Sequence, residues 1–243
     1  MTDFSMKRRA PLLDGRLSAA MALAENCRMF ADIGADHGRL SAVMLLQDDK
    51  RRALVTDISA PALQKSRDLI GRLGLNSRVT FAVANGLDAL DSLADEQPDT
   101  VFILGMGGDT VSGIIRRGVD KMNGASLILG AQTDLPMVRQ TLCESGYRIC
   151  REVVASEGKH DYVLIRAEIG QASYTEEELL LGPVLLKEMP ENWFGLLERR
   201  MTLLQKGLQA MRASKLEKDA ARLALFERES GYIQQVMERL RKE

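Results

Sequence analysis

The sequence of 243 residues predicts an α/β protein with a mostly parallel sheet, followed by an α-helical C-terminal domain. Through most of the chain, strand-like apolar runs alternate with helix-like segments, which is typical of right-handed βαβ units. Toward the C-terminus, apolar residues recur at helical spacing instead. We therefore expect two domains, residues 1–170 and 171–243.

Five parallel strands are expected, each closed by glycine or a polar residue. The run "RMFADI" ends in a glycine-rich turn, and "GRLSAVMLLQ" after it indicates a helix. The next helix has Pro61 in its first turn and Gly74 just after its last periodic residue. The runs "VFIL" and "LILG" are apolar on both faces, as in a sheet covered on both sides. The expected strands span residues 28–33, 52–58, 78–85, 99–108 and 125–131.

Two further strand-like runs, 146–157 and 160–169, are joined by only Gly158 and Lys159. So short a link permits only antiparallel pairing. Five parallel strands followed by an antiparallel hairpin is the arrangement of Rossmann-like class I methyltransferases, whereas NAD-binding Rossmann domains normally lack the hairpin. We therefore predict a Rossmann-like methyltransferase fold for the first domain.

The C-terminal domain is expected to start with a short helix whose capping box is Thr175 and Glu178, after which Pro183 and Pro190 interrupt the chain. Apolar residues then recur at spacings of four and three, which predicts a coiled-coil seam. A longer step between two sets of them predicts a helical hairpin, with one long helix containing a stutter as the alternative. The sets are Leu197, Met201, Leu204, Leu208 and Met211, then Leu216, Ala220, Leu223, Ile233, Met237 and Leu240.

Composition and charge narrow the setting in which the protein works. The net charge of −1 gives no overall basic field for nucleic acid, so an RNA partner would need a local basic patch. No signal-peptide pattern follows the basic N-terminal stretch, and no run reaches the ~18 apolar residues of a membrane span. Three cysteines without a CxxC pair suit a reducing compartment. We predict a cytoplasmic protein without membrane attachment; the oligomeric state is left open, with a monomer favoured.

The first strand ends in the pattern Asp32-x-Gly34-x-Asp36-x-Gly38. A strand, a glycine-rich turn and a helix form a corner where a nucleoside or an anion can approach the backbone. The pattern lacks the third glycine position of GxGxxG and carries an extra acid. That acid would repel a pyrophosphate but not a zwitterionic sulfonium, which favours S-adenosylmethionine over NAD. By itself the motif could also be a strand end that binds nothing.

Three more strand ends carry polar or glycine residues. Asp57 ends the second strand, where an acid can accept both ribose hydroxyls, although Asp57 or Ser59 could instead cap the next helix. Asn85 and Gly86 close the third strand, either beside the cofactor adenine or as a simple turn. Gly105 to Gly108 close the fourth and would bring bare backbone close to the methyl-transfer centre. Ligands bind at such strand ends in open α/β sheets, so the four together favour a cofactor site.

The fourth strand end also restricts the reaction. It has neither the Asp/Asn-Pro-Pro-aromatic clamp of exocyclic-amine methylation nor the cysteine that carbon-five methylation of pyrimidines needs. A ring nitrogen such as adenine N1 needs only alignment with the methyl group and later loss of a proton from the exocyclic amine. Asp32 and Asp36 are the nearest carboxylates for that proton. We place Asp32 and Met106 at the catalytic centre, where Met106 would touch cofactor or target base, or serve only in packing.

His37 raises the question of a metal. His160 is the only other histidine, and no CxxC or HxxE partner accompanies either, so no metal is predicted and His37 is assigned to the wall of the pocket. The predicted cofactor-binding residues are Asp32, Gly34, Asp36, His37, Asp57, Ile58, Asn85, Gly86, Gly105, Met106 and Gly107.

Taken together, these segments resemble the bacterial tRNA (adenine-N1)-methyltransferases of the TrmK type. The resemblance covers about Asp14 to Ile165, in consistent order, through "DGRLSAAMALAENCRMFADIGADHGRLS", "ALVTDISAPALQKSR", "VANGLDAL", "LGMGGDTVSGII" and "ESGYRICREVVASEGKHDYVLI". It implies a Rossmann-like catalytic domain, a C-terminal coiled-coil domain, S-adenosylmethionine as cofactor and methylation of N1 of adenine 22 in tRNA. It also implies that Gly105 to Gly108 lie beside the target base.

The sequence departs from this family at two places. Leu104 stands where the family usually has Ala, and Gly130 to Asp134 stand where it has Gln-Pro-Asn, on the substrate side. A tRNA would need basic residues for its phosphates, and the candidates, which could equally be ordinary surface charges, are Lys7, Arg8, Arg9, Arg16, Arg39, Arg116 and Arg117. The alternatives to a tRNA methyltransferase are a methyltransferase acting on a small molecule or another RNA, and a non-catalytic adaptor that binds the cofactor.

Overall fold

The structure is a computed structural model that describes residues 10–93, 96–158, 160–213 and 220–241. The chain divides into two compact units, Met1–Ala172 and Ser173–Glu243. Within the described ranges, none of the helices combines the length and the apolar character that crossing a bilayer requires.

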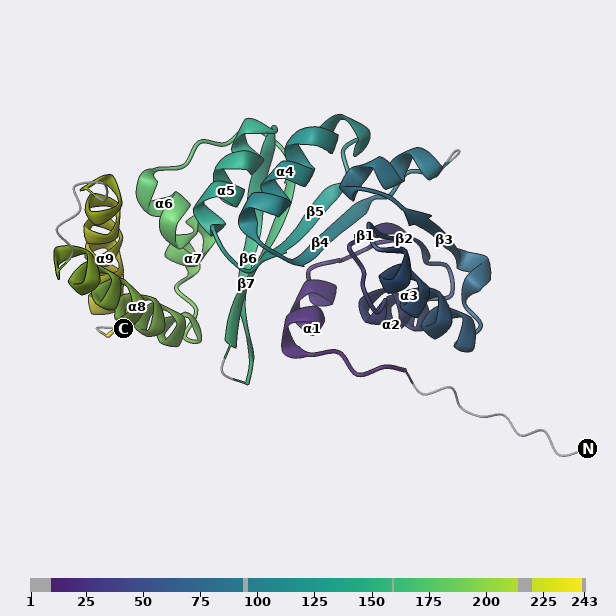
Figure 1. The fold of residues 1–243 in the computed structure, drawn as a ribbon, viewed down its shortest axis with the longest axis horizontal. Helices are drawn as coiled ribbons and strands as arrows, with labels where there is room; N and C mark the ends of the chain where they lie inside the picture. Colours follow the sequence, from purple (N-terminus) through teal and green to yellow (C-terminus); the bar gives the residue numbers. More distant parts are fainter. Residues whose placement is uncertain (1–9, 94–95, 159, 214–219, 242–243) are drawn as a thin grey trace, which may run out of the picture. The chain divides into compact units, whose positions relative to one another are not determined.

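The first unit contains a seven-stranded sheet of order β3-β2-β1-β4-β5-β7-β6 (Figure 1). The strands β1 to β5 are parallel, and β7 runs antiparallel to both β5 and β6. The predicted parallel sheet with an antiparallel C-terminal hairpin is therefore confirmed. The strands are β1 (Met29–Ile33), β2 (Arg52–Asp57), β3 (Val79–Val83), β4 (Thr100–Met106), β5 (Ser126–Ala131), β6 (Tyr147–Glu157) and β7 (His160–Ile169).

Helices cover both faces of this sheet (Figure 1). On one face lie α1 (Gly15–Ala22), α2 (Arg39–Gln47) and α3 (Ala60–Arg72), and on the other lie α4 (Gly108–Gly118) and α5 (Leu135–Glu144). Phe30 of β1 and Phe102 of β4 meet edge to face in the core, with ring centroids 5.9 Å apart. Double coverage explains why β1 is buried along its whole length. Short 3-10 helices are η1 (Asn76–Arg78), η2 (Gly86–Ser92) and η3 (Val119–Lys121).

Local signals set the helix ends. Ser59 caps α3 by accepting the Ala62 N–H at 3.3 Å, and Pro61 lies in its first turn, as predicted. Gly74 follows the helix with φ +72, a conformation that L side chains rarely adopt. Helix α1 was not anticipated; it begins after Asp14, whose Oδ1 accepts the Leu17 N–H at 2.7 Å.

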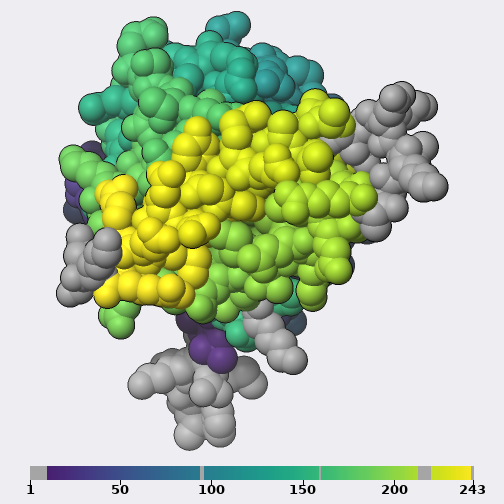
Figure 2. All heavy atoms as spheres, turned by 90° about the vertical axis from the view of Figure 1, so that its left-hand side faces the viewer, coloured from purple at the N-terminus to yellow at the C-terminus, as the bar shows by residue number. Residues whose placement is uncertain are grey.

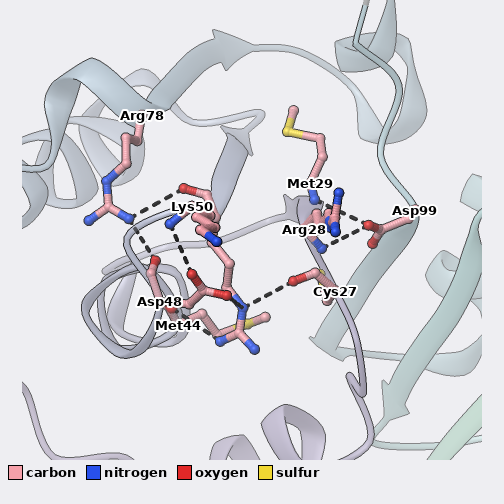
Figure 3. A network of polar contacts seen from close by, with 9 residues as sticks. Cys27, Arg28, Met29, Met44, Asp48, Lys50, Arg78 and Asp99 are labelled. Carbon is pink, nitrogen blue, oxygen red and sulfur yellow. Dashed lines mark hydrogen bonds and ion pairs between the residues drawn. The ribbon is translucent and has the colours of Figure 1, made fainter.

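At the amino-terminal edge of the parallel strands, polar contacts tie connecting segments together (Figure 3). Asp99 Oδ2 accepts the N–H groups of Arg28 at 2.8 Å and Met29 at 3.2 Å. Arg51 donates from Nε to the carbonyl of Cys27 at 3.1 Å. Burial raises the pKa of the Cys27 thiol to about 12, so this cysteine is not a nucleophile at neutral pH. The contacts of Asp99 and Arg51 thus hold together the segments that precede β1, β2 and β4.

The second unit begins with α6 (Glu176–Leu181), whose predicted capping box is present: Thr175 Oγ1 accepts the Glu178 N–H at 3.2 Å, and Glu178 Oε2 accepts the Thr175 N–H at 2.7 Å. Pro183 does not simply interrupt the chain. It is the first residue of α7 (Pro183–Glu188), a position where the missing proline N–H would have no helical partner anyway.

Two helices of 21 residues each, α8 (Trp193–Ala213) and α9 (Ala220–Leu240), pack against each other (Figure 2). The pair agrees with the predicted hairpin, whose expected turn, between Met211 and Leu216, lies partly outside the described residues. Of the predicted seam, Leu197, Leu204 and Ile233 are buried, whereas Ala220 is exposed. A bidentate ion pair joins Arg200 of α8 to the buried Glu229 of α9 (Nε–Oε1 2.5 Å, Nη2–Oε2 2.8 Å). Whether the pair is a coiled coil stays a prediction.

Candidate functional site

The candidate site lies at the carboxyl ends of the parallel strands, where β1 is flanked by β2 on one side and β4 on the other. The connections from β1 and β4 leave in opposite directions, and such a switch point opens a crevice for ligands. Two cavities occur there, of about 390 and 490 Å³. Gly34, Leu104 and Gly105 line both, so the cavities adjoin.

The smaller cavity, here termed the Asp32 cavity, is lined among others by Asp14, Arg16, Asp32, Asp36, His37 and Gln132. The larger one, the Asp57 cavity, is lined among others by Asp57, Ile58, Asn85, Gly86, Met106 and Arg117. Residues that the sequence predicted as one cofactor site are thus brought to one edge of the sheet and distributed over two connected cavities.

Asp32 is the buried acid of the site, with 5% of its surface exposed. The Ser41 hydroxyl of α2 donates to its Oδ2 at 2.6 Å. Burial raises the pKa of the Asp32 carboxyl to about 6, and the negative charge of Asp57 adds to this, while the Ser41 hydrogen bond and the Arg16 charge oppose it. A buried carboxylate of this kind favours any positive charge brought into the adjoining cavity.

The glycine turn after β1 has left-handed backbone at Gly34 (φ +73) and also at Asp36 (φ +47). Thr56 of β2 holds this turn through its carbonyl, which accepts the N–H groups of Gly34 and Ala35 at 2.9 Å each. A Cβ on Gly34 would collide with Cε of Met106. Met106, which lines the Asp57 cavity, therefore packs directly against Gly34, which lines both cavities.

Asp57 connects the ends of β1 and β2. Its Oδ2 accepts the Asp36 N–H at 3.2 Å, and its Oδ1 accepts the Ser59 N–H at 2.8 Å. The carboxylate is thereby oriented by two backbone groups and keeps lone pairs for further donors. Next to it, the side chain of Ile58 is 70% exposed, an apolar surface at the rim of the Asp57 cavity.

His37 and Asp36 form an exposed pair at the mouth of the Asp32 cavity. His37 Nδ1 lies 2.5 Å from Asp36 Oδ2, and Lys65 Nζ of α3 lies 3.7 Å from Asp36 Oδ1. Among the described residues, no group of three or more His, Cys, Asp or Glu side chains could hold a metal ion.

The glycines at the carboxyl end of β4 have different roles from one another. Gly105 (φ +77) lines both cavities beside a bulge in the β4–β5 pairing. Gly107 lines neither cavity and caps α4, and a Cβ on Gly108 would collide with the Thr133 carbonyl. Gly108 is thus required by close packing of the α4 start on the loop after β5, whereas Gly105 borders the site.

Arg16 is the site residue whose position the sequence did not indicate. The sequence suggests only a phosphate contact for it, but it lines the Asp32 cavity, and its Nη1 lies 2.8 Å from where a Cβ on Gly105 would be. Its guanidinium also lies over the Tyr162 ring, 5.7 Å from the centroid. These neighbours are far apart in the chain, so no local pattern could have located it.

The other basic residues that the sequence suggests as phosphate contacts do not form one cluster. Arg117 donates to Asn85 Oδ1 at 3.4 Å, and Arg116 pairs with Glu144 at 3.4 Å. Arg39 is exposed at the start of α2 and lines the Asp32 cavity. Lys7, Arg8 and Arg9 lie outside the described residues.

A doubly covered open sheet with acids at the ends of β1 and β2 and a glycine turn at its switch point defines a Rossmann-like enzyme that binds a nucleoside-containing cofactor. More particularly, the chain belongs to the family described as "Methyltransferase domain", which it matches over residues 13–165.

Known proteins are similar to this chain over most of its length. The tRNA (adenine(22)-N(1))-methyltransferase of Bacillus subtilis is 29% identical over 183 residues, which cover 72% of this chain and 76% of that protein. The crystal structure of B. subtilis TrmK matches with a TM-score of 0.82 at 24% identity, covering 93% of this chain and 99% of that one. A Streptococcus pneumoniae structure in complex with S-adenosyl-L-methionine, described as a putative tRNA (m1A22) methyltransferase, has a TM-score of 0.81 at 21% identity, covering 93% and 100%. These two likenesses show that the fold is shared.

Proposed function

We propose that this protein transfers a methyl group from S-adenosylmethionine to N1 of an adenine in tRNA, at position 22 as in the name of the B. subtilis relative. The observation that carries the proposal is the pair of adjoining cavities at the switch point. One has an oriented carboxylate for a nucleoside, and the other has a buried carboxylate for a positive charge. The similarity to the B. subtilis enzyme, which covers 72% of this chain, supports the same function.

The residues of the Asp57 cavity fit the nucleoside part of this cofactor. The oriented Asp57 carboxylate would accept the ribose hydroxyls, and the exposed Ile58 side chain would lie against the adenine ring. Asn85, at the end of β3, would face the adenine edge. When bound, S-adenosylmethionine supplies an electrophilic methyl group on a sulfonium centre.

The chemistry leaves separate roles for two carboxylates. Adenine N1 attacks with its own lone pair, so no base is needed for that step, and the N1-methylated product is a cation that becomes neutral when its exocyclic amine loses a proton. Asp32, buried and bonded to Ser41, stabilises the positive charge of the cofactor. Asp36, exposed and adjacent to His37, can pass the proton to solvent. Met106 packs across the glycine turn and aligns the reactants at the junction of the cavities.

Asp57→Ala is expected to weaken S-adenosylmethionine binding by ~1–3 kcal/mol, because charge-assisted hydrogen bonds to the ribose are lost. Titration calorimetry would measure the affinity. Asp57→Asn keeps a carbonyl oxygen for one backbone N–H, so an intermediate loss is expected. Unaltered affinity in a folded Asp57→Ala protein would remove Asp57 from the cofactor site.

The proposed reaction is tested with purified protein, S-adenosylmethionine carrying a labelled methyl group, and two tRNA transcripts that differ only at position 22. A transcript with adenine 22 should yield 1-methyladenosine on nucleoside mass spectrometry, and one with guanine 22 should yield none. Equal labelling of both would contradict the proposed position. Cellular tRNA with an unchanged 1-methyladenosine level after removal of the gene would contradict the reaction itself.

The same assays separate the two alternatives. Methyl transfer in extracts freed of RNA would indicate a small-molecule substrate. Cofactor binding with no transfer to any fraction would indicate an adaptor.

A further inference from the structure

An open groove of about 820 Å³ adjoins the Asp32 cavity. It is here termed the α2–α3 groove and is lined by His37, Arg39, Lys65, Asp68, Leu69 and Arg72, among others. His37 and Arg39 line both the groove and the Asp32 cavity, so the two are continuous at that point.

The groove is positively charged on a chain whose net charge is −1. It contains three cationic side chains and one carboxylate, that of Asp68. Asp68 Oδ1 accepts from the Gln64 amide at 2.8 Å rather than from a cation. Within the described ranges, neither Arg39 nor Arg72 has a carboxylate at ion-pair distance, and Lys65 reaches only Asp36 at 3.7 Å. Arg72 Nε also donates to the backbone carbonyl of Asp68 at 3.2 Å, but that carbonyl is uncharged, so the positive charges of the groove can still attract an anion from outside.

The spacing of the cations suits an extended polyanion. Lys65 and Arg72 are seven residues apart on α3, which places them on one face about 10 Å apart along the helix axis. Both side chains are exposed. An enclosed nucleotide site would instead have buried polar groups converging on a single phosphate.

We propose that the α2–α3 groove binds the phosphate backbone of the substrate RNA beside the target adenine. This rests on the proposed function, because the Asp32 cavity must then receive an adenine extruded from its stack. Phosphate contacts fix the register and orientation of a nucleic acid, and contacts next to the cavity would hold the strand while the base is turned out. Arg39, at the boundary, would bind the phosphate nearest the target.

The test compares two double variants of the full chain in tRNA filter binding over a range of salt. Lys65→Gln/Arg72→Gln removes two charges from the groove, and glutamine is a good helix former, so α3 should persist. Arg28→Gln/Lys50→Gln removes two exposed charges from the opposite, amino-terminal edge of the sheet. The groove variant should bind tRNA at least ~10-fold more weakly. The plot of log K against log salt should also become less steep by about 1.4, because each lost single-strand phosphate contact reduces the magnitude of the slope by ~0.7. The control should retain the wild-type affinity and slope.

The outcomes separate this proposal from the proposed function. If the groove variant binds tRNA with wild-type affinity and slope, the proposal that the groove binds RNA is wrong. If that variant also methylates tRNA, the proposed function is still supported. A wild-type protein that binds tRNA through the groove but never methylates it would overturn the function and support the groove. A wild-type protein that does not bind tRNA at all would overturn both. S-adenosylmethionine affinity, measured by calorimetry, should be the same in all three proteins.

Discussion

Asp32→Asn is expected to abolish methyl transfer and, at neutral pH, to make the protein more stable. The carboxylate is buried, and burial raises its pKa from 3.8 to about 6. Above pH 6 the folded protein therefore holds an ionised group that would be better solvated in the unfolded chain. The amide of Asn removes this cost, while its oxygen can still accept the Ser41 hydrogen bond. The lost charge should weaken cofactor binding and turnover far more than tRNA binding.

The raised pKa of Asp32 determines whether the stability of the folded protein rises or falls with pH. A carboxyl whose folded pKa is raised binds its proton more tightly in the folded state, so the wild-type protein loses stability as the pH rises from about 4 to 6. At about 1.4 kcal/mol per pKa unit, the ionised Asp32 lowers the free energy of unfolding by about 3 kcal/mol above pH 6. Asp32→Asn should be more stable by up to that amount at pH 7.5, and the difference should shrink toward pH 4.

Urea unfolding of both proteins at several pH values measures this difference, and filter binding measures the tRNA affinity. Asp36→Asn is the matched control, because Asp36 is exposed and its substitution should change stability little. A stability gain independent of pH would show that the charge of Asp32 is not its cause. A larger loss of tRNA affinity than of turnover would show that Asp32 acts on the RNA instead.

Glu152→Leu is expected to destabilise the first unit by about 3–5 kcal/mol, since it leaves the Arg139 guanidinium buried without its carboxylate. Arg139 Nε of α5 donates to Glu152 Oε1 of β6 at 2.9 Å, and the side chains are 1% and 0% exposed. The pair fastens α5, which follows the loop beside the Asp32 cavity, to the hairpin.

The double variant Arg139→Met/Glu152→Leu removes both charges and should recover most of the lost stability, because replacing a buried pair by apolar groups is often neutral. Thermal unfolding of the single and double variants would show this. A double variant as unstable as the sum of the two single variants would mean that packing, not the unpaired charge, dominates at this position.

Most of the candidate site could be predicted from the sequence because its residues follow one another along successive strand ends. Asp32, Gly34, Asp57, Asn85 and Gly105 each close a strand, and parallel strands present those ends at one edge. The fold assignment is similarly local in origin: the two-residue link of the hairpin admits only antiparallel pairing.

The features of the site that the sequence does not predict depend instead on contacts between distant parts of the chain. The sequence predicts no helix at α1, which has only eight residues, and therefore does not place Arg16 over Tyr162. Gly108 was expected near the target base, yet its lack of a side chain is required by the Thr133 carbonyl. No sequence motif distinguishes Lys65 and Arg72 from ordinary surface charges.

The sequence by itself determined the strand order along the chain, the glycine-rich turn after the first strand and the acids at two strand ends. Each of these depends on the backbone preferences of single residues and on the spacing of apolar residues over a short stretch of sequence. Only the tertiary structure decided that Arg16 faces Gly105, that Met106 packs across Gly34, and that α2 and α3 line a basic groove continuous with the Asp32 cavity. The physical reason is that these contacts depend on how helices pack on the sheet, which short-range spacing does not encode.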